Sequence, residues 1–391
     1  MKPTRHLVLL LCSVFFLFAC SSLPFPSSQW KQNEVKGHNV ILFVPGLFGS
    51  TLVEESSGDL YFQTFGQALW GNTLALNGDK LGIEDAKGLR AGGILESVTI
   101  IPGIYSADAY GESVRYLQTT FGQNTIILPF FYDWRDENIK AVQALGKEVR
   151  ALKTAGAKKI AIVGHSLGGI ITSFYLRYGE QELPRIQETW EGTKYVDAVV
   201  VAGTPYRGTI AAYRDLLYGT KVGISKSQLN AVTLGSFPSY YHFLPPIEDY
   251  PDVFKAENWP KWKMGLFANI ENINSESIQA RSIYTEKHLK NGLMFNTLLR
   301  EKLKKPALAK TPFLSLIGRG HSTLAGVKEN TQWITSEEGD GLVTVASALP
   351  IQAFKEALTL KHLSMPLEHR GMFTEESVQK EVTQFLRENG F

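Results

Sequence analysis

The stretch IAIVGHSLGGIITSF, residues 160–174, places a serine between two apolar runs. Gly164, Ser166 and Gly168 fit the pattern G-x-S-x-G, in which a strand turns sharply into a helix and holds the serine hydroxyl out above a sheet. Small residues on both sides of the serine let neighbouring backbone pass. The pattern predicts Ser166 as a nucleophile and the amide of Leu167, at the start of the helix, as an oxyanion donor.

Short apolar runs rich in β-branched residues recur along the chain, and several lack polar alternation. Such runs are typical of parallel strands covered on both faces. We expect strands within 39–46, 98–103, 125–134, 160–164, 196–205, 313–318 and 357–363.

Apolar residues at spacings of three and four predict a helix over 139–152. A last helix is predicted after Thr374, its N-cap, with Val378, Val382 and Phe385 on the buried face. Because strand and helix signals alternate, the fold class is α/β with a mostly parallel sheet flanked by helices.

The interval from about 207 to 311 interrupts this alternation with aromatic and polar segments. It is too long for a simple loop, so we expect an inserted helical cap or lid. Trp259, Trp262 and Phe267 are candidates to line a pocket beneath it, or to form plain core.

The N-terminus has a basic start, an apolar run over 7–18 and the ending LFAC. The run has the length of a signal-peptide core and is short for a membrane span. The ending resembles a bacterial lipoprotein box, which predicts a signal peptide over 1–19 and lipidation of Cys20; a cut elsewhere, with Cys20 incidental, is the alternative. We expect a flexible tether over 20–37, a folded domain over 38–391, and an exported, membrane-anchored lipoprotein, with Ser21 favouring the outer membrane.

The charge balance argues against a nucleic-acid-binding protein, and the cysteine content argues against a disulfide-stabilised one. Without residues 1–19 the chain has as many basic as acidic residues, 38 of each, so no basic field for nucleic acid is expected. The two cysteines are Cys12 and Cys20, so the mature domain has no internal disulfide. No close cluster of His, Cys or Asp predicts a metal, and we expect no cofactor.

A serine nucleophile needs a histidine base, which in an α/β-hydrolase follows the nucleophile along the chain. His242 and His288 follow Ser166 but fall in the expected cap, which leaves His321, His362 and His369. His369 falls in a loop between the last strand and the last helix, where this fold places its base, whereas His362 lies inside a strand signal. We therefore favour His369 and keep His362 as the alternative; His165 is too close to Ser166 to act as its base.

The acid that orients the histidine is best placed at Asp340, in a glycine-flanked turn before the last strand. Asp197, Glu337 and Glu338 remain competitors. A second oxyanion donor is expected in the loop FVPGLFGST, from the amide of Leu47 or Phe48.

Several segments together resemble the lecithin:cholesterol acyltransferase family, in the order that the family has them. The resemblance implies the α/β-hydrolase fold, Ser166, Asp340 and His369 as the catalytic triad, and the amides of Leu47 and Leu167 as the oxyanion hole. It also implies a pocket shaped by Phe48, Tyr132, Asp133, Trp134 and Arg135. The alternative for the YDWR residues is a buried aromatic and an ion pair that support the sheet, which the same sequence would also fit. The matching segments are ILFVPGLFGSTL, IIPG, ILPFFYDWR, IVGHSLGG, VAGTPYRGT, EEGDGLVT and EHRGMF.

This resemblance favours a membrane-tethered serine lipase or acyltransferase that cleaves an acyl ester of phospholipid through an acyl-enzyme. The acyl group would pass to water or to an alcohol such as a sterol. The alternatives are a triacylglycerol lipase or carboxylesterase without acyl transfer, and a non-catalytic lipoprotein with the hydrolase fold. The sequence does not predict an oligomeric state.

Overall fold

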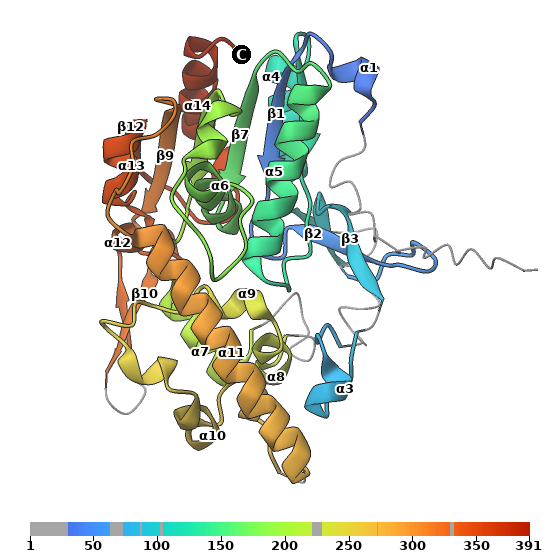
Figure 1. The fold of residues 1–391 in the computed structure, drawn as a ribbon, viewed down its shortest axis with the longest axis vertical. Coiled ribbons are helices and arrows are strands. Elements are labelled where there is room, and N and C mark those ends of the chain that lie inside the picture. Colours follow the sequence, from blue (N-terminus) through green and yellow to red (C-terminus); the bar gives the residue numbers. More distant parts are fainter. Residues whose placement is uncertain are drawn as a thin grey trace, which may run out of the picture.

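A six-stranded parallel sheet forms the centre of the computed structural model (Figure 1). The structure describes residues 30–62, 73–86, 88–101, 105–220, 229–271, 273–328 and 332–391. Every neighbouring pair in the sheet is parallel, so the predicted sheet type is confirmed. In spatial order the strands are β12 (Thr359–Pro366), β9 (Pro312–Arg319), β8 (Ala198–Ala202), β7 (Ile160–His165), β1 (Asn39–Val44) and β6 (Thr125–Pro129).

Helices cover both faces of this sheet (Figure 1). Alternate residues of β1 point to opposite sides: Val40 and Leu42 pack in the core that includes α5 (Asn138–Thr154) and α6 (Leu167–Tyr178). Ile41 and Phe43 pack in the core that includes α4 (Gly111–Phe121) and α14 (Glu376–Glu388). The predicted helix over 139–152 is confirmed as α5, and Val378, Val382 and Phe385 are buried on α14 as predicted. Thr374 is not the cap, because it ends a short 3-10 turn, η6 (Met372–Thr374).

Two predicted strands differ from expectation. The run 98–103 does not join the sheet: β4 (Ser97–Ile101) pairs antiparallel with β5 (Tyr105–Asp108). A short apolar run carries no information about its partner, so the sequence could not separate these outcomes. β12 is in the sheet but is largely exposed, because it pairs with β9 at the sheet edge.

Residues 30–37, predicted as part of a flexible tether, pack on the domain instead. Val35, in α1 (Gln32–Val35), is fully buried, and Trp30 Nε1 donates a 2.6 Å hydrogen bond to Glu148 on α5. Residues 1–29, which include the predicted signal peptide, Cys20 and the rest of the tether, lie outside the described residues. In the described part of the chain, no helix is long and apolar enough to cross a bilayer.

The segment between β8 and β9 is mainly helical and lies across the carboxyl ends of the sheet strands (Figure 1). We call it the cap; that it opens and closes as a lid stays a prediction. Its helices are α7 (Ile210–Tyr218), α8 (Ala231–Gly235), α9 (Pro238–Tyr241), α10 (Trp259–Trp262) and α11 (Ser275–Arg300), with short 3-10 turns η2 (Pro251–Phe254), η3 (Ala256–Asn258) and η4 (Gly265–Phe267).

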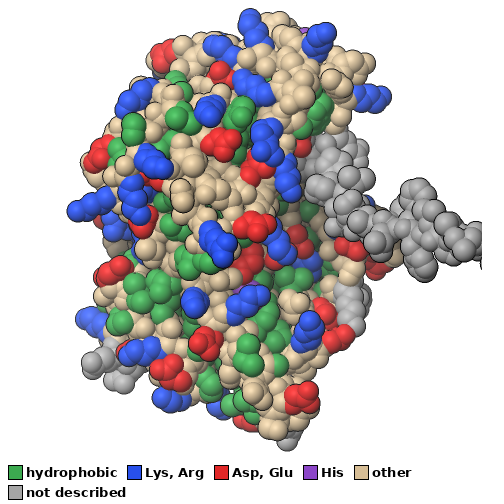
Figure 2. Space-filling view, in the orientation of Figure 1, with side chains coloured by type: hydrophobic (Ala, Val, Ile, Leu, Met, Phe, Trp, Pro, Cys, Tyr) green, Lys and Arg blue, Asp and Glu red, His purple; other side chains and the backbone are tan. Residues whose placement is uncertain are grey.

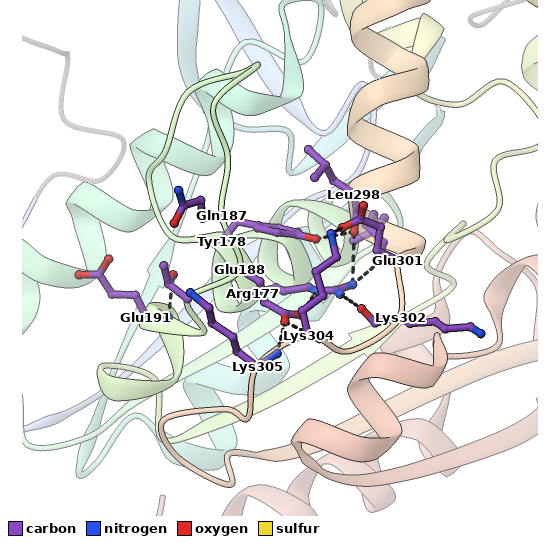
Figure 3. Close-up of polar contacts among 12 residues, drawn as sticks. Arg177, Tyr178, Gln187, Glu188, Glu191, Leu298, Glu301, Lys302, Lys304 and Lys305 are labelled. Atoms are coloured by element: carbon purple, nitrogen blue, oxygen red, sulfur yellow. Dashed lines mark hydrogen bonds and ion pairs between the residues drawn. The ribbon is translucent and has the colours of Figure 1, made fainter.

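A buried ion pair ties the end of the cap to the helix that follows Ser166 (Figure 3). Arg177 on α6 donates to Glu188 at 2.7 Å and to the carbonyls of Leu298, Leu299 and Lys302, around the end of α11. Glu188 also accepts hydrogen bonds from the amides of Lys304 and Lys305. Both side chains of the pair are almost fully buried, at 0% and 2% exposure, so this contact fixes the cap to α6.

Smaller elements complete the fold. Besides β4–β5, two further antiparallel pairs are β2 (Ser50–Glu54) with β3 (Leu89–Ile94) and β10 (Thr323–Lys328) with β11 (Gln332–Ser336). On the face drawn in Figure 2, acidic and basic side chains of the described residues lie interspersed. The remaining helices in the described part of the chain are α3 (Gly78–Leu81), η1 (Glu191–Lys194), α12 (Val345–Ala348) and α13 (Gln352–Ala357).

Candidate active site

The turn between β7 and α6 holds Ser166 in a strained conformation. Its φ of 52° lies in the left-handed region, which residues with a side chain rarely adopt. A Cβ atom on Gly168 would lie 2.1 Å from the carbonyl oxygen of Val44, and one on Gly164 would lie 3.0 Å from the backbone of Gly168. Both positions therefore require glycine for the turn to close, as the sequence pattern predicts.

Three side chains that are far apart in the sequence form one hydrogen-bonded chain. His369 Nε2 lies 3.1 Å from Ser166 Oγ, and His369 Nδ1 lies 2.8 Å from Asp340 Oδ2. Because a carboxylate accepts, Nδ1 carries a proton, and an Nε2 without a proton can accept from the serine hydroxyl. All three residues are buried. The arrangement has the distances of a serine, histidine and acid triad.

Asp340 is held at both carboxylate oxygens. While Oδ2 accepts from His369, Oδ1 accepts from the amides of Leu342 and Val343 at 2.9 and 2.7 Å. Burial opposes its ionisation, but the charge and hydrogen bond of His369 and the two amides outweigh burial, so the pKa of Asp340 lies below its ordinary value. Asp340 is thus ionised and fixed in orientation.

The competing candidates lie elsewhere. His362 is exposed on the edge strand β12, and Glu337 and Glu338 are exposed in the turn before Asp340. Asp197 accepts from the amide of Ile160, at the start of β7, whereas Ser166 follows the end of that strand. His321 bridges to Asp340 through backbone and is not in the hydrogen-bonded chain of Ser166.

The loop after β1 lies directly against the nucleophile. A Cβ on Gly46 would come within 2.9 Å of Ser166 Cβ, and the amide of Gly49 closes the turn on the carbonyl of Gly46 at 3.0 Å. Within the described residues, neither the amide of Leu47 nor that of Leu167 donates to a protein acceptor. Both amides are free to bind an oxyanion.

Sequence reasoning missed a second hydrogen-bonded chain behind the first. Gly46 N–H donates to Tyr110 Oη at 2.9 Å, Tyr110 Oη lies 2.8 Å from His165 Nδ1, and His165 Nε2 lies 2.9 Å from the carbonyl of His369. Burial, and after it the charge of His369, lowers the pKa of His165 to about 3, so its ring is neutral. Since the carbonyl accepts from Nε2–H, Nδ1 must accept from the Tyr110 hydroxyl. No local motif marks Tyr110.

A cavity of about 440 Å³ opens beside the triad. Apolar side chains make up much of its wall, and its charged lining residues apart from histidine are Arg214, Asp215 and Arg370. Arg214 pairs with Asp215 at 2.7 Å. The lining includes Leu47, Phe48, Leu95, Ala109, Tyr110, Ser113, Thr209, Ala211, Ala212, Tyr240, Phe243, Leu342, Met372 and Phe373.

Of the predicted pocket residues, Phe48 lines this cavity, whereas Tyr132, Asp133 and Trp134 do not. Instead, Tyr132 and Trp134 support the loop after β1. Tyr132 Oη donates to the carbonyl of Pro45 at 2.8 Å, and Trp134 Nε1 donates to that of Ser50 at 2.9 Å. Asp133 accepts two hydrogen bonds from the guanidinium of Arg135 and one from its amide. These three residues thus lie behind the cavity wall, in the arrangement that the alternative expects, with buried aromatics and a supporting ion pair. That they shape the pocket stays a prediction.

The three cap aromatics are also absent from the cavity wall. Trp259 is fully buried and stacks on Tyr241 with ring centroids 5.3 Å apart, and Phe267 is fully buried in the same core. Trp262 is partly exposed on α10. Trp259 and Phe267 pack within the cap, and the cavity-facing residues of the cap come from α7 and from the segment that includes Tyr240 and Phe243.

Comparison with known proteins gives the family. The family model for lecithin:cholesterol acyltransferase matches residues 70–307. The chain belongs to the lecithin:cholesterol acyltransferase family. The match includes Ser166 and ends before Asp340 and His369, so the structure alone brings those two to the nucleophile.

The chain is also similar to one named relative in sequence and to solved structures. Phospholipase A(1) LCAT3 of Arabidopsis thaliana is 22% identical over 433 residues, covering 90% of this chain and 91% of that protein. A chain in the crystal structure of the Tle4–Tli4 complex has a TM-score of 0.56 at 11% identity, covering 90% of this chain and 99% of that one. The mature Bacillus licheniformis lipase BlEst2 has a TM-score of 0.38 at 15% identity, over 90% and 93%. The predicted α/β-hydrolase fold is confirmed.

Proposed function

We propose that this protein is a serine lipase and acyltransferase that cleaves the acyl ester of a phospholipid. The observation that carries the proposal is the Ser166–His369–Asp340 chain at the wall of a largely apolar cavity. The family supports a lipid ester as substrate, and the relative whose name states a phospholipase supports a phospholipid.

In the first half of the reaction, Ser166 Oγ attacks the ester carbonyl carbon while its proton moves to His369 Nε2. The amides of Leu47 and Leu167 bind the carbonyl oxygen as it becomes an oxyanion. His369 then gives the proton to the departing glycerol oxygen as the carbon–oxygen ester bond breaks. The product is an acyl group bound to Ser166 and a free lysophospholipid.

In the second half, water or a lipid alcohol replaces the first leaving group. His369 takes its proton, its oxygen bonds to the acyl carbon, and Ser166 regains its hydrogen from His369. An alcohol acceptor yields a new ester, and water yields a fatty acid. We further propose that acylated Cys20 anchors the exported protein to a membrane next to this substrate.

The test uses purified protein with phosphatidylcholine vesicles carrying a labelled acyl chain, with triolein in parallel, and with and without a long-chain alcohol or sterol. We expect acyl release from phosphatidylcholine and, with the acceptor, a new labelled ester. The Ser166→Ala variant should release none. Acyl release from triolein alone would overturn the phospholipid assignment, and unchanged activity of the Ser166→Ala variant would overturn the nucleophile.

A further inference from the structure

The cavity beside Ser166 contains a cationic side chain that the triad does not use. Arg370 directly follows His369 in the chain, so its Cα lies about 3.8 Å from that of the base. It lines the cavity and is exposed to solvent. The other cavity arginine, Arg214, is paired with Asp215, whereas no carboxylate among the described residues pairs with Arg370. The cavity wall therefore has an excess positive charge at Arg370.

The first turn of α4 lies next to this charge. η6 (Met372–Thr374), which begins two residues after Arg370, packs against α4, and Phe373 and Tyr110 both contact the ring of Phe43. The charge of Arg370 also acts on the phenol of Tyr110, the residue that caps α4. Arg370 is thus on the side of the cavity where α4 begins.

Ser113, in that first turn, supplies a second polar group. Its residue is 2% exposed and lines the cavity, and its hydroxyl has no hydrogen-bond partner in the described part of the chain. A hydroxyl on the cavity wall that makes no hydrogen bond to the protein is available to a ligand that enters the cavity. The helix N-terminus adds a partial positive charge at the same place. The acidic residue of this turn, Glu112, is exposed and does not line the cavity.

We infer that Arg370 and Ser113 form a subsite for a phosphate group next to the nucleophile. A guanidinium can donate two parallel hydrogen bonds to a phosphate, and a serine hydroxyl and a helix N-terminus bind the same anion. In a glycerophospholipid the phosphate is separated from the acyl ester only by glycerol carbons and ester oxygens. A phosphate held here places that ester beside Ser166. The inference rests on the proposed function and adds what distinguishes a phospholipid from a neutral glyceride.

The test compares Arg370→Gln with the parent on three substrates: phosphatidylcholine in neutral detergent micelles, diacylglycerol with the same chains in the same micelles, and soluble p-nitrophenyl butyrate. We expect kcat/KM for phosphatidylcholine to fall about tenfold or more, with diacylglycerol and the soluble ester changing less than about threefold. Arg370→Lys should recover part of the loss, since lysine keeps the positive charge but lacks the paired N–H donors of the guanidinium. Ser113→Ala should also lower kcat/KM for phosphatidylcholine and leave kcat/KM for the other two substrates nearly unchanged. Arg185→Gln, which removes an exposed arginine after α6, should change none of the three.

Binding is tested separately from turnover. Glycerol phosphate should inhibit hydrolysis of p-nitrophenyl butyrate competitively, with an inhibition constant about tenfold higher in Arg370→Gln, whereas glycerol should not inhibit. An equal loss on all three substrates would mean that Arg370 acts through His369, and no selective loss would mean that it binds no phosphate; either overturns the subsite. If the parent lacks activity on phosphatidylcholine but hydrolyses the other two substrates, the proposed function fails. The subsite is then tested by the glycerol phosphate experiment: competitive inhibition that weakens in Arg370→Gln supports a phosphate site, and no inhibition overturns it.

Discussion

The phenol of Tyr110 donates a 2.8 Å hydrogen bond to Nδ1 of His165, and His165 in turn donates to the carbonyl of His369. Tyr110 also accepts from the amide of Gly46, which precedes Leu47, the proposed oxyanion donor. One chain of hydrogen bonds therefore connects the loop of Leu47 to the backbone of His369, the proposed base. The relative positions of these two parts depend on side chains that take no part in proton transfer.

Removing the Tyr110 hydroxyl should weaken both stability and turnover. Tyr110→Phe leaves the buried Gly46 amide and His165 Nδ1 without partners, which costs about 1–3 kcal/mol in the free energy of unfolding. Because the Leu47 amide then shifts, we expect kcat on a soluble ester to fall about tenfold. Tyr116→Phe on the same helix is the matched control: its hydroxyl donates to the carbonyl of Gln379, away from the site. A Tyr110→Phe variant that loses stability but keeps kcat would refute the link.

Asp340→Asn should nearly abolish activity while the protein stays folded. Since the amides of Leu342 and Val343 both need an acceptor, the asparagine must turn its oxygen toward them and its NH₂ toward His369. His369 then accepts at Nδ1 and carries its proton on Nε2, where it cannot take one from Ser166. We expect kcat to drop on the order of 10³–10⁴-fold.

The control for this substitution is Asp197→Asn, which removes a carboxylate paired with Lys153 at the other end of β7. Steady-state rates with p-nitrophenyl butyrate, with circular dichroism to check folding, should show near-parental kcat for the control. Less than a tenfold loss in Asp340→Asn would remove Asp340 from the triad.

The buried His165 should make stability depend on pH. Its pKa is lowered from 6.5 to about 3 in the folded state, so between these values the unfolded chain binds the additional proton. Stability therefore rises with pH across this window and is lost as pH falls, by roughly 3 kcal/mol between pH 7 and pH 4. Urea unfolding at several pH values should show a smaller loss in His165→Gln than in the parent. Parallel pH curves for the two proteins would contradict this origin.

The Arg177–Glu188 pair should be a stability element and not a catalytic one. Glu188→Gln leaves the fully buried guanidinium of Arg177 without its counter-charge, for which we expect a loss of about 3–5 kcal/mol. The comparison is Glu381→Gln, whose partner Lys361 is half exposed, with an expected loss of less than about 1 kcal/mol. Denaturant unfolding measures both. The folded fraction of Glu188→Gln should keep parental kcat on a soluble ester; a large kcat defect there would show that the cap anchor also shapes the site.

Local sequence was enough for the features that local geometry controls. The turn at Ser166 requires glycine at 164 and 168 because backbone passes within van der Waals contact of both, and those requirements are visible in a stretch of five residues. The spacing of apolar residues likewise identified α5 and most of the sheet, because burial of one helix face or of a whole strand leaves a periodic record.

Tertiary structure decided what depends on contacts between distant segments. Ser166 and His369 are hydrogen-bonded although they are 203 positions apart, and Tyr110 and His165 although they are 55 apart. The periodicity of a sequence does not predict such contacts. The run 98–103 has the composition of a strand of the central sheet, but it pairs antiparallel with β5. The YDWR segment was expected to shape the pocket, and in the structure Tyr132 supports the loop that contains Pro45. A side chain's chemistry is set by its own residue type, whereas its neighbours, and therefore its role, are set by how the whole chain packs.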